Sequence, residues 1–211
     1  MGEEQHSSRD EMTNRAFRTV LLGIEEIAGK RGMASLLRQA NLAQYINNYP
    51  PSDLEHGGHL QSYVAQLNRA LFDLYGARGA RAIMRRVGNE QAKSALQENI
   101  LVTNATSIAL KFLSRRRKVK TVLDTVAKEY SQQLHTTIKF VEEGDVFYWE
   151  DPNCNDCINW TSESPVCFVM AGFIHGMVAW AIGSEEFKVE EIECRAKGDP
   201  TCKYRITLNA E

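Results

Sequence analysis

The chain has 211 residues, of which 43% are hydrophobic and 25% are charged. A chain of this length and composition can bury a full hydrophobic core without disulfide bonds, so we expect a globular protein rather than a disordered one. The 25 basic and 27 acidic side chains leave a formal net charge of -2. Because this charge provides no general attraction to nucleic acid, we expect no nucleic-acid partner.

Residues 1–12 are polar and contain no apolar segment of the kind that a secretory signal needs. We therefore expect a disordered tail and a cytoplasmic protein. Residues 13–211 are expected to form a single domain, with a helical part over residues 13–134 and a hairpin-helix-hairpin part over residues 135–211.

The first part of the chain is predicted to be helical. Apolar residues recur at helical spacing over residues 17–27, after a cap at Thr13 or Asn14 and before Gly29, which is expected to end the helix. The basic run at residues 115–118 is interpreted as a solvated turn between two helices. Further helices are predicted over residues 33–39, 59–75, 77–99, 100–113 and 119–134.

The last third of the chain has the alternating pattern of strands. Hairpins are predicted over residues 138–148 and 187–208, the second with a turn at residues 198–200. Between them, residues 166–182 form an apolar helix, capped by Ser164, that is too short for a membrane span. These elements predict an α+β fold, in which a helical N-terminal half packs on a small antiparallel sheet of four to five strands and a buried helix lies between two hairpins.

All five cysteines of the chain lie within this last third. In a reducing compartment, clustered cysteines more often bind metal or act in redox chemistry than form structural disulfides. The two arms of the last hairpin offer Cys194 and Cys202, and we expect Cys167 and Glu191 to complete a tetrahedral zinc site. Residues three apart on a regular strand face opposite sides, so Glu191 and Cys194 can share a metal only if the strand contains a bulge near residues 190–191.

Cys154 and Cys157 form a C-x-x-C pair in a polar loop. They are possible additional metal or redox residues. With two of the other cysteines they would complete a four-thiolate zinc site or an iron-sulfur site, and alone they would form a redox pair. The simpler alternative is that they are small buried hydrophobic side chains.

The last hairpin has a recognisable motif. Its residues Glu191, Cys194, Ala196, Gly198 and Cys202 follow the pattern E-x-x-C-x-A-x-G-x-x-x-C, and with this motif the chain resembles the 4-vinyl-reductase domain family. The resemblance implies a fold shared with TRAPP tethering subunits and related to haem-based nitric-oxide sensor domains, often as a homodimer. In sensor members of the family, cysteines and a glutamate hold zinc, which implies the same role here for the matching residues Cys167, Glu191, Cys194 and Cys202.

Aromatic side chains are concentrated in the same part of the chain. We expect a hydrophobic cavity between the sheet and the helices, where a planar or aliphatic small molecule would bind. The candidate ligand-binding residues are His175, Trp149, Phe173 and Trp180. A buried histidine that is satisfied within the core is the alternative for His175.

These observations favour a sensory domain that binds a hydrophobic or tetrapyrrole-like small molecule and contains structural zinc. The alternatives are an accessory substrate carrier of bacteriochlorophyll or tetrapyrrole biosynthesis, an iron-sulfur or thiol redox sensor, and a tethering or scaffold protein. No catalytic residue is predicted, because the glycines at positions 76 and 79 lie between helices and not after a strand, as a dinucleotide fingerprint requires. If the protein is an enzyme, we expect a reductase-associated tetrapyrrole protein.

Overall fold

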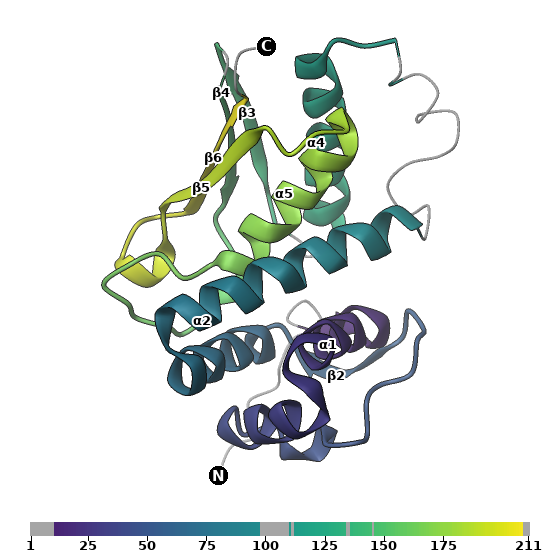
Figure 1. Ribbon diagram of the computed structural model, residues 1–211, viewed down its shortest axis with the longest axis vertical. Helices are drawn as coiled ribbons and strands as arrows, with labels where there is room; N and C mark the ends of the chain where they lie inside the picture. Colours follow the sequence, from purple (N-terminus) through teal and green to yellow (C-terminus); the bar gives the residue numbers. More distant parts are fainter. Residues whose placement is uncertain (1–10, 98–109, 111, 134–135, 145, 209–211) are drawn as a thin grey trace.

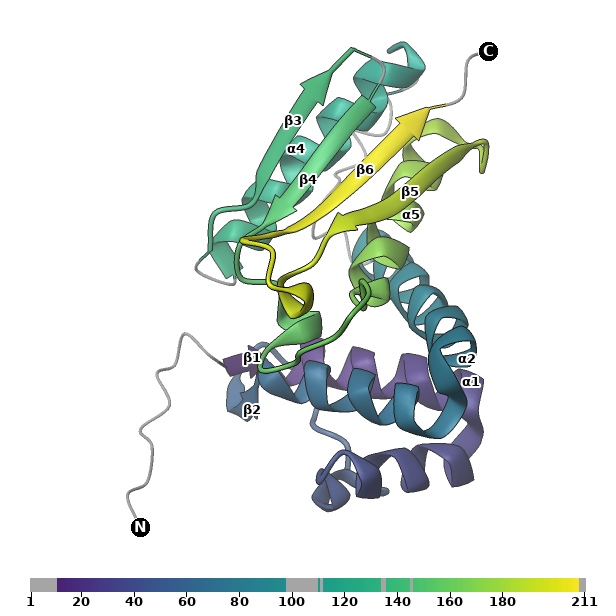
Figure 2. The same cartoon turned by 90° about the vertical axis from the view of Figure 1, so that its left-hand side faces the viewer.

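The structure is a computed structural model and describes residues 11–97, 110, 112–133, 136–144 and 146–208. Helix α1 (Asn14–Gln39) and the first half of helix α2 (Ser62–Gln97) form one end of the molecule, and a four-stranded sheet forms the other end (Figure 1). Two hydrophobic cores correspond to these two ends. The second half of α2 runs along the boundary and connects them (Figure 2).

Helices α1 and α2 each contain a sharp kink at a glycine. Gly29 in α1 has φ 68° and Gly76 in α2 has φ 66°, a region that glycine adopts without steric cost. The sequence predicted helix ends at these two glycines, and the structure has a change of direction at each, with helix on both sides. The predicted cap is confirmed at Thr13, whose side-chain hydroxyl accepts a hydrogen bond from the backbone N–H of Ala16 at 3.3 Å.

A short two-stranded sheet precedes and follows α1. Strand β1 (Glu11–Thr13) pairs antiparallel with strand β2 (His56–Leu60), and the turn Ala43–Tyr45 lies between α1 and β2. Residues 11 and 12, which the sequence placed in the tail, therefore belong to a strand. His59 and Leu60, which it placed in a helix, belong to β2. The buried His59 contacts the Tyr45 hydroxyl at 2.7 Å and the Asn14 side-chain oxygen at 2.9 Å, which gives this histidine a structural role.

The C-terminal half follows the predicted hairpin-helix-hairpin order. Helix α4 (Arg115–Gln133) is followed by strands β3 (Lys139–Glu143) and β4 (Val146–Asp151), the short turn η3 (Asn155–Cys157) and helix α5 (Phe168–Ile182). Strand β5 (Phe187–Glu193), turn η4 (Arg195–Lys197) and strand β6 (Cys202–Leu208) complete the chain. The sheet is antiparallel with the order β3-β4-β6-β5, which confirms the α+β fold with a buried helix between two hairpins.

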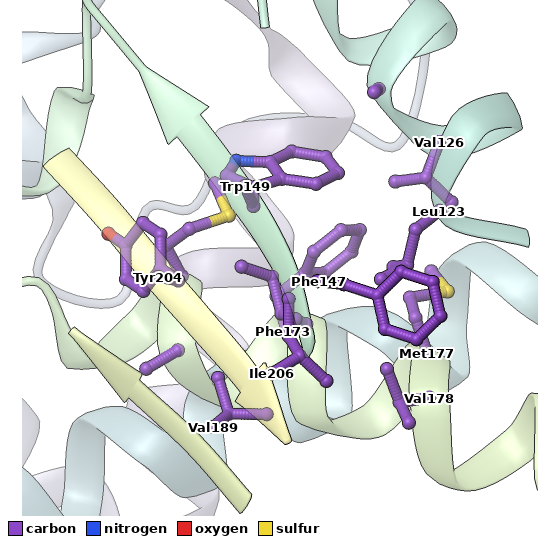
Figure 3. Close-up of a cluster of buried hydrophobic side chains, with 14 of the residues drawn as sticks. Leu123, Val126, Phe147, Trp149, Phe173, Met177, Val178, Val189, Tyr204 and Ile206 are labelled. Atoms are coloured by element: carbon purple, nitrogen blue, oxygen red, sulfur yellow. The ribbon is translucent and has the colours of Figure 1, made fainter. Parts of the chain in front are cut away.

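Helices α4 and α5 cover one face of the sheet. Alternate residues of the strands point into this core, and Figure 3 shows Phe147 and Trp149 of β4 beside Tyr204 and Ile206 of β6. Phe173 of α5 lies in the same cluster. Residues of the opposite face form ion pairs across the strands, between Lys203 and Glu150 and between Arg205 and Glu190.

Three predicted boundaries differ from the structure. The basic run at residues 115–118 forms the first turn of α4, where Arg116 pairs with Glu142. Helix α5 begins at Phe168, so Ser164 does not cap it. The helix predicted over residues 100–113 lies mostly outside the described residues. Among the described helices, none combines the length and the apolar composition that crossing a membrane requires.

The crossing of α2 and α5 is unusually close because glycines lie at the contact. A Cβ atom on Gly88 would lie 1.9 Å from the carbonyl oxygen of Val169, and one on Gly172 would lie 2.1 Å from the carbonyl oxygen of Arg85. The two backbones are therefore in direct contact, and any side chain would separate the helices. The contact at Val169 also fixes the first turn of α5.

We expect Gly88→Ala to destabilise the protein by about 1–3 kcal/mol, because the added methyl group overlaps backbone atoms that cannot move independently. Gly23→Ala is the matched control, since its Cβ would meet the Val87 side chain at an ordinary 3.4 Å. Urea unfolding of both variants measures the difference. Equal stability of Gly88→Ala and the unmodified protein would contradict the described crossing.

Candidate metal centre and adjoining cavity

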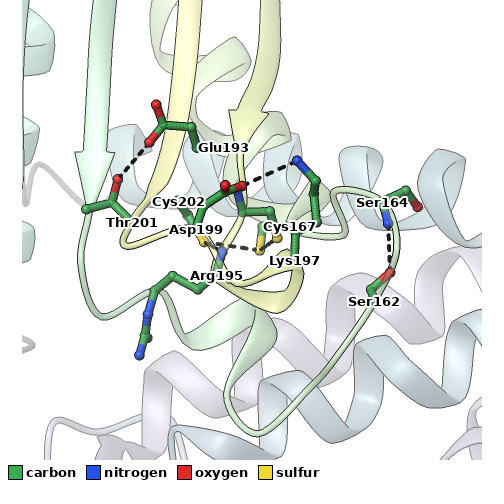
Figure 4. A network of polar contacts seen from close by, with 10 residues as sticks. Ser162, Ser164, Cys167, Glu193, Arg195, Lys197, Asp199, Thr201 and Cys202 are labelled. Atoms are coloured by element: carbon green, nitrogen blue, oxygen red, sulfur yellow. Dashed lines mark hydrogen bonds and ion pairs between the residues drawn. The ribbon is translucent and has the colours of Figure 1, made fainter.

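The five cysteines converge at one end of the four-stranded sheet. Cys154 and Cys157 lie on either side of η3, Cys167 directly precedes α5, and the ends of β5 and β6 supply Cys194 and Cys202. Each thiol is free, and each cysteine is between 0% and 4% exposed. Figure 4 shows Cys167 and Cys202 beside the turn that contains Lys197 and Asp199. The C-x-x-C pair and the three later cysteines thus belong to one buried cluster.

The sulfur atoms are in contact but are not bonded. The Sγ of Cys202 lies 3.6 Å from that of Cys157 and 3.7 Å from that of Cys167, and the Cys167 and Cys194 sulfurs are also 3.7 Å apart. In a tetrahedral zinc-thiolate site with bonds of about 2.3 Å, neighbouring sulfurs are about 3.8 Å apart. The spacing therefore fits sulfurs arranged around a tetrahedral metal ion.

Two groups of four residues have ligand atoms that all lie within 4.8 Å of one another. One group contains Cys167, Glu191, Cys194 and Cys202, the four residues that the sequence analysis selected. The other group contains Cys154, Cys157, Cys167 and Cys202. The structure brings all six candidate residues together, while metal binding by them is still a prediction.

A bulge in β5 turns Glu191 and Cys194 toward the same side. Glu191 is opposite Tyr204 and Glu193 is opposite Lys203, which leaves Ile192 as an extra residue in the strand. The sequence predicted this irregularity near residues 190–191, and the structure has it between residues 191 and 193. The bulge allows two residues three positions apart to face one site.

The Glu191 carboxylate is oriented toward the cluster by the backbone. Its Oε2 accepts a hydrogen bond from the N–H of Cys167 at 2.9 Å. Its Oε1 is buried and has no hydrogen-bond partner within the described part of the chain. Burial, followed by the charge of Cys194, raises the pKa of Glu191 to about 9. An unpartnered buried carboxylate oxygen beside three sulfurs is the donor set that a zinc ion requires.

The turn between β5 and β6 supports two of the sulfurs. The Asp199 carboxylate accepts a hydrogen bond from the N–H of Cys194 at 2.8 Å, and Gly198 adopts φ 98°. The N–H of Arg195 donates to the Sγ of Cys202 at 3.4 Å. Hydrogen bonds of this kind orient metal ligands and stabilise thiolate charge.

Without a cation, the cluster resists full ionisation. Hydrogen bonds from the other cysteines, first Cys154 and then Cys167, hold the pKa of the Cys157 thiol well below its ordinary value. Burial raises the pKa of the Cys167 thiol. A bound dication would favour the thiolate form of every ligand that contacts it, and its binding would release protons.

Asp156, inside the C-x-x-C segment, connects the cluster to helix α5. Its carboxylate is 1% exposed and accepts a hydrogen bond from the N–H of Met170 at 3.0 Å, in the first turn of α5. Burial raises the pKa of Asp156 to about 7. The sequence analysis did not identify this residue, although an acidic side chain between two clustered cysteines was a visible signal.

A cavity of about 550 Å³ lies on the other side of the C-x-x-C segment, where β1, α1, α2, α4 and α5 approach one another. Asn155 and Asp156 line it, and so does Tyr130, whose pKa is raised by burial. Its apolar lining residues include Met12, Ala16, Val20, Val64, Ala95, Val169, Met170 and Phe173. The cavity has the size and the mixed lining that are typical of small-molecule sites.

The four predicted ligand-binding residues do not lie together. Phe173 lines the cavity, whereas Trp149 is fully buried beneath the sheet. His175 packs against Phe187 and contacts Glu185 at 3.1 Å, and Trp180 is 37% exposed. Aromatic composition alone did not distinguish residues of the core and the surface from residues of a cavity.

We expect Asp156→Ala to destabilise the protein by about 1–3 kcal/mol, because it leaves the buried N–H of Met170 without its acceptor. Asp156→Asn keeps an oxygen acceptor of the same shape and should retain most of the stability. Thermal unfolding of the two variants measures this difference. An alanine variant as stable as the asparagine variant would contradict the role given to this hydrogen bond.

A pH effect is expected from His175. Burial lowers the pKa of His175 below its ordinary 6.5, and Glu185 partly opposes this shift. Because the unfolded chain binds the proton more tightly, the contribution of His175 to stability is complete above about pH 6.5 and is lost as the pH falls. Unfolding from pH 7.5 to 5 should show a shallower acid loss in His175→Gln than in the unmodified protein. Glu185→Gln should show a steeper loss, and an unchanged slope in both variants would oppose this account.

Residues 147–208, which include all five cysteines, match the family model of the 4-vinyl-reductase domain. The chain is also 34% identical over 56 residues to the "Uncharacterized protein MJ0745" of Methanocaldococcus jannaschii. This similarity covers 26% of the chain and 30% of that protein, so the chain spans less than a third of this relative's length.

Solved structures with a similar fold include H-NOX proteins. The H-NOX from Shewanella woodyi in the Fe(II)CO ligation state has a TM-score of 0.55 at 13% identity, over 95% of this chain and 97% of that one. The phenol-responsive sensory domain of the transcription activator PoxR, solved with phenol, has a TM-score of 0.51 at 16% identity, over 82% and 90% of the two chains. At this level of identity the similarity concerns the fold. With the cysteine motif in place in residues 147–208, the chain carries a 4-vinyl-reductase domain.

Proposed function

We propose that this protein is a sensory domain that binds a hydrophobic small molecule and uses a zinc ion to hold one wall of its cavity. One observation supports this function above the others. The segment from Cys154 to Cys157 faces the sulfur cluster with its two thiols, while Asn155 and Asp156 between them line the cavity. A change on one side of this short segment is therefore transmitted to the other.

Helix α5 provides a second connection. Cys167 belongs to the cluster and directly precedes the helix, and Val169, Met170 and Phe173 in its first two turns line the cavity. A metal ion that joins Cys167 to Cys194 and Cys202 would fix this end of α5 against the last hairpin. The metal would thereby determine the shape of the cavity without contacting the bound molecule.

Zinc fits the donor set better than an iron-sulfur cluster does. Thiolate and carboxylate ligands in a tetrahedron are characteristic of zinc, and zinc supplies structural stabilisation without redox chemistry. Sulfur atoms 3.6–3.7 Å apart leave no space between them for the irons and sulfides of a cluster. The residues that would hold zinc are Cys167, Glu191, Cys194 and Cys202.

The lining of the cavity suggests the class of ligand. Apolar side chains form most of the wall, and Tyr130, Gln91 and Asp156 offer a few polar groups. This combination suits an uncharged aromatic or aliphatic molecule with a hydroxyl or carbonyl group. The PoxR domain of similar fold is described with phenol, which makes phenol a reasonable first probe.

A tetrapyrrole is the second candidate ligand, since one structure of similar fold is described in a study of haem redox potential and porphyrin distortion. His175, the axial ligand considered from the sequence, contacts Glu185 and Phe187 and does not line the described cavity. A carrier of tetrapyrroles would bind added haemin with a shifted absorption band. We also retain the proposed homodimer, which analytical ultracentrifugation tests.

We expect Cys194→Ser and Cys202→Ser to abolish stoichiometric zinc binding and to lower stability by more than about 3 kcal/mol, because binding energy at a structural zinc site is folding energy. Thr201→Ala lies in the same turn and is the control, since its hydroxyl contacts only the rim residue Glu193 in the described hydrogen bonds. Elemental analysis and thermal unfolding measure the two effects. Unchanged stability of both serine variants would rule out a structural metal.

Ligand binding is tested by filling the cavity. Ala95 of α2 lines it, so Ala95→Phe should abolish the binding of phenol measured by titration calorimetry. Ala77→Phe places the same side chain at an exposed position of the same helix and should leave binding unchanged. Equal loss in both variants, or binding of phenol that survives Ala95→Phe, would show that the cavity is not the binding site.

A further inference from the structure

We propose that the five cysteines and Glu191 form a binuclear metal site, in which the thiolates of Cys167 and Cys202 bridge two metal ions. This inference rests on the metal centre of the proposed function and extends it. One ion would be completed by Glu191 and Cys194, and the other by Cys154 and Cys157.

The grouping of the ligand atoms carries the inference. Each of the two groups of four has all its ligand atoms within 4.8 Å of one another, and both groups contain Cys167 and Cys202. Two tetrahedra that share two corners have this composition, with a pair of terminal ligands on each side of the shared edge. Thiolate sulfur has the lone pairs to bind two metal ions, as in Zn₂Cys₆ modules.

The distances fit this arrangement. The shared edge, between the sulfurs of Cys167 and Cys202, is 3.7 Å long. The first tetrahedron has a second edge of 3.7 Å between Cys167 and Cys194, and the other has one of 3.6 Å between Cys157 and Cys202. All three are close to the edge of about 3.8 Å expected around zinc with bonds of about 2.3 Å.

The charge of the site also permits a second ion. With a single ion at the first group, Cys154 and Cys157 would be buried thiols, 0% and 4% exposed, that contribute nothing to binding. A second dication is matched by the ionisation of these two thiols, so the net charge of the buried site stays the same. Adding the second ion therefore places no further net charge in the interior.

Polar groups approach sulfurs from both groups. The N–H of Arg195 donates to the bridging Cys202 sulfur at 3.4 Å, and the Tyr204 hydroxyl lies 3.7 Å from the sulfur of Cys154. Tyr204 is fully buried and is placed by its position in β6 opposite Trp149. A hydrogen bond to a thiolate is thus available on the Cys154 side of the site as well as at the bridge.

Metal stoichiometry is the first test. The full chain, saturated with Zn²⁺ and freed of loosely bound ions, should contain two zinc ions per chain by native mass spectrometry. Cys154→Ser combined with Cys157→Ser should retain one ion, and Glu191→Gln combined with Cys194→Ser should also retain one. Thr201→Ala, which changes the same turn without removing a ligand, should retain two.

The bridge is tested in the unmodified protein, so the result does not depend on the folding of a variant. After replacement of zinc by ¹¹³Cd²⁺, the NMR spectrum should contain two resonances of equal intensity that are split by coupling through the shared thiolates. Two uncoupled resonances would refute the bridge. A single resonance and one ion per chain, with no effect of the Cys154 and Cys157 substitutions, would refute the binuclear site and leave the single-zinc function intact. Absence of bound metal, or iron with labile sulfide, would refute both proposals.

Discussion

The close crossing of α2 and α5 is the constraint on which the rest of the molecule depends. Because Gly88 and Gly172 let the two backbones touch, α5 is held at a fixed depth between the sheet and the N-terminal helices. This depth places Cys167, at the start of α5, against the ends of β5 and β6. It also directs Met170 and Phe173 toward the space enclosed by α1, α2 and α4. One packing contact thus positions both the sulfur cluster and the cavity.

The parts of the fold that depend on local pattern could be predicted from the sequence. The alternation in the last hairpin, its break near residue 191 and the turn at Gly198 were sufficient to predict a bulged strand pair that brings Glu191, Cys194 and Cys202 together. The apolar composition of α5 was likewise enough to predict a buried helix between two hairpins. These features are determined by residues that are close in sequence, where periodicity and turn chemistry act directly.

The features that the sequence did not reveal arise from contacts between distant segments. The C-x-x-C pair joins the later cysteines only because the loop after β4 folds against the start of α5, where the Asp156 carboxylate accepts the Met170 N–H. The cavity needs four helices and β1 to define it, so no single pattern predicts its lining. Trp149 and Trp180 have similar chemistry, yet one is in the core and the other is exposed, because burial is decided by the packing of whole elements.

The bulge at Ile192 changes how the E-x-x-C spacing of this chain is understood. Metal-binding motifs are commonly taken to record the distance between ligands, but here the spacing records an extra residue in a strand. Ile192 is 37% exposed and contributes its backbone, not its side chain, to the alignment of the residues on either side. The segment is therefore sensitive to its length and tolerant of the identity of this residue. Removing one residue would restore a regular strand and turn Cys194 to the outer face, so the site depends on counting as much as on chemistry.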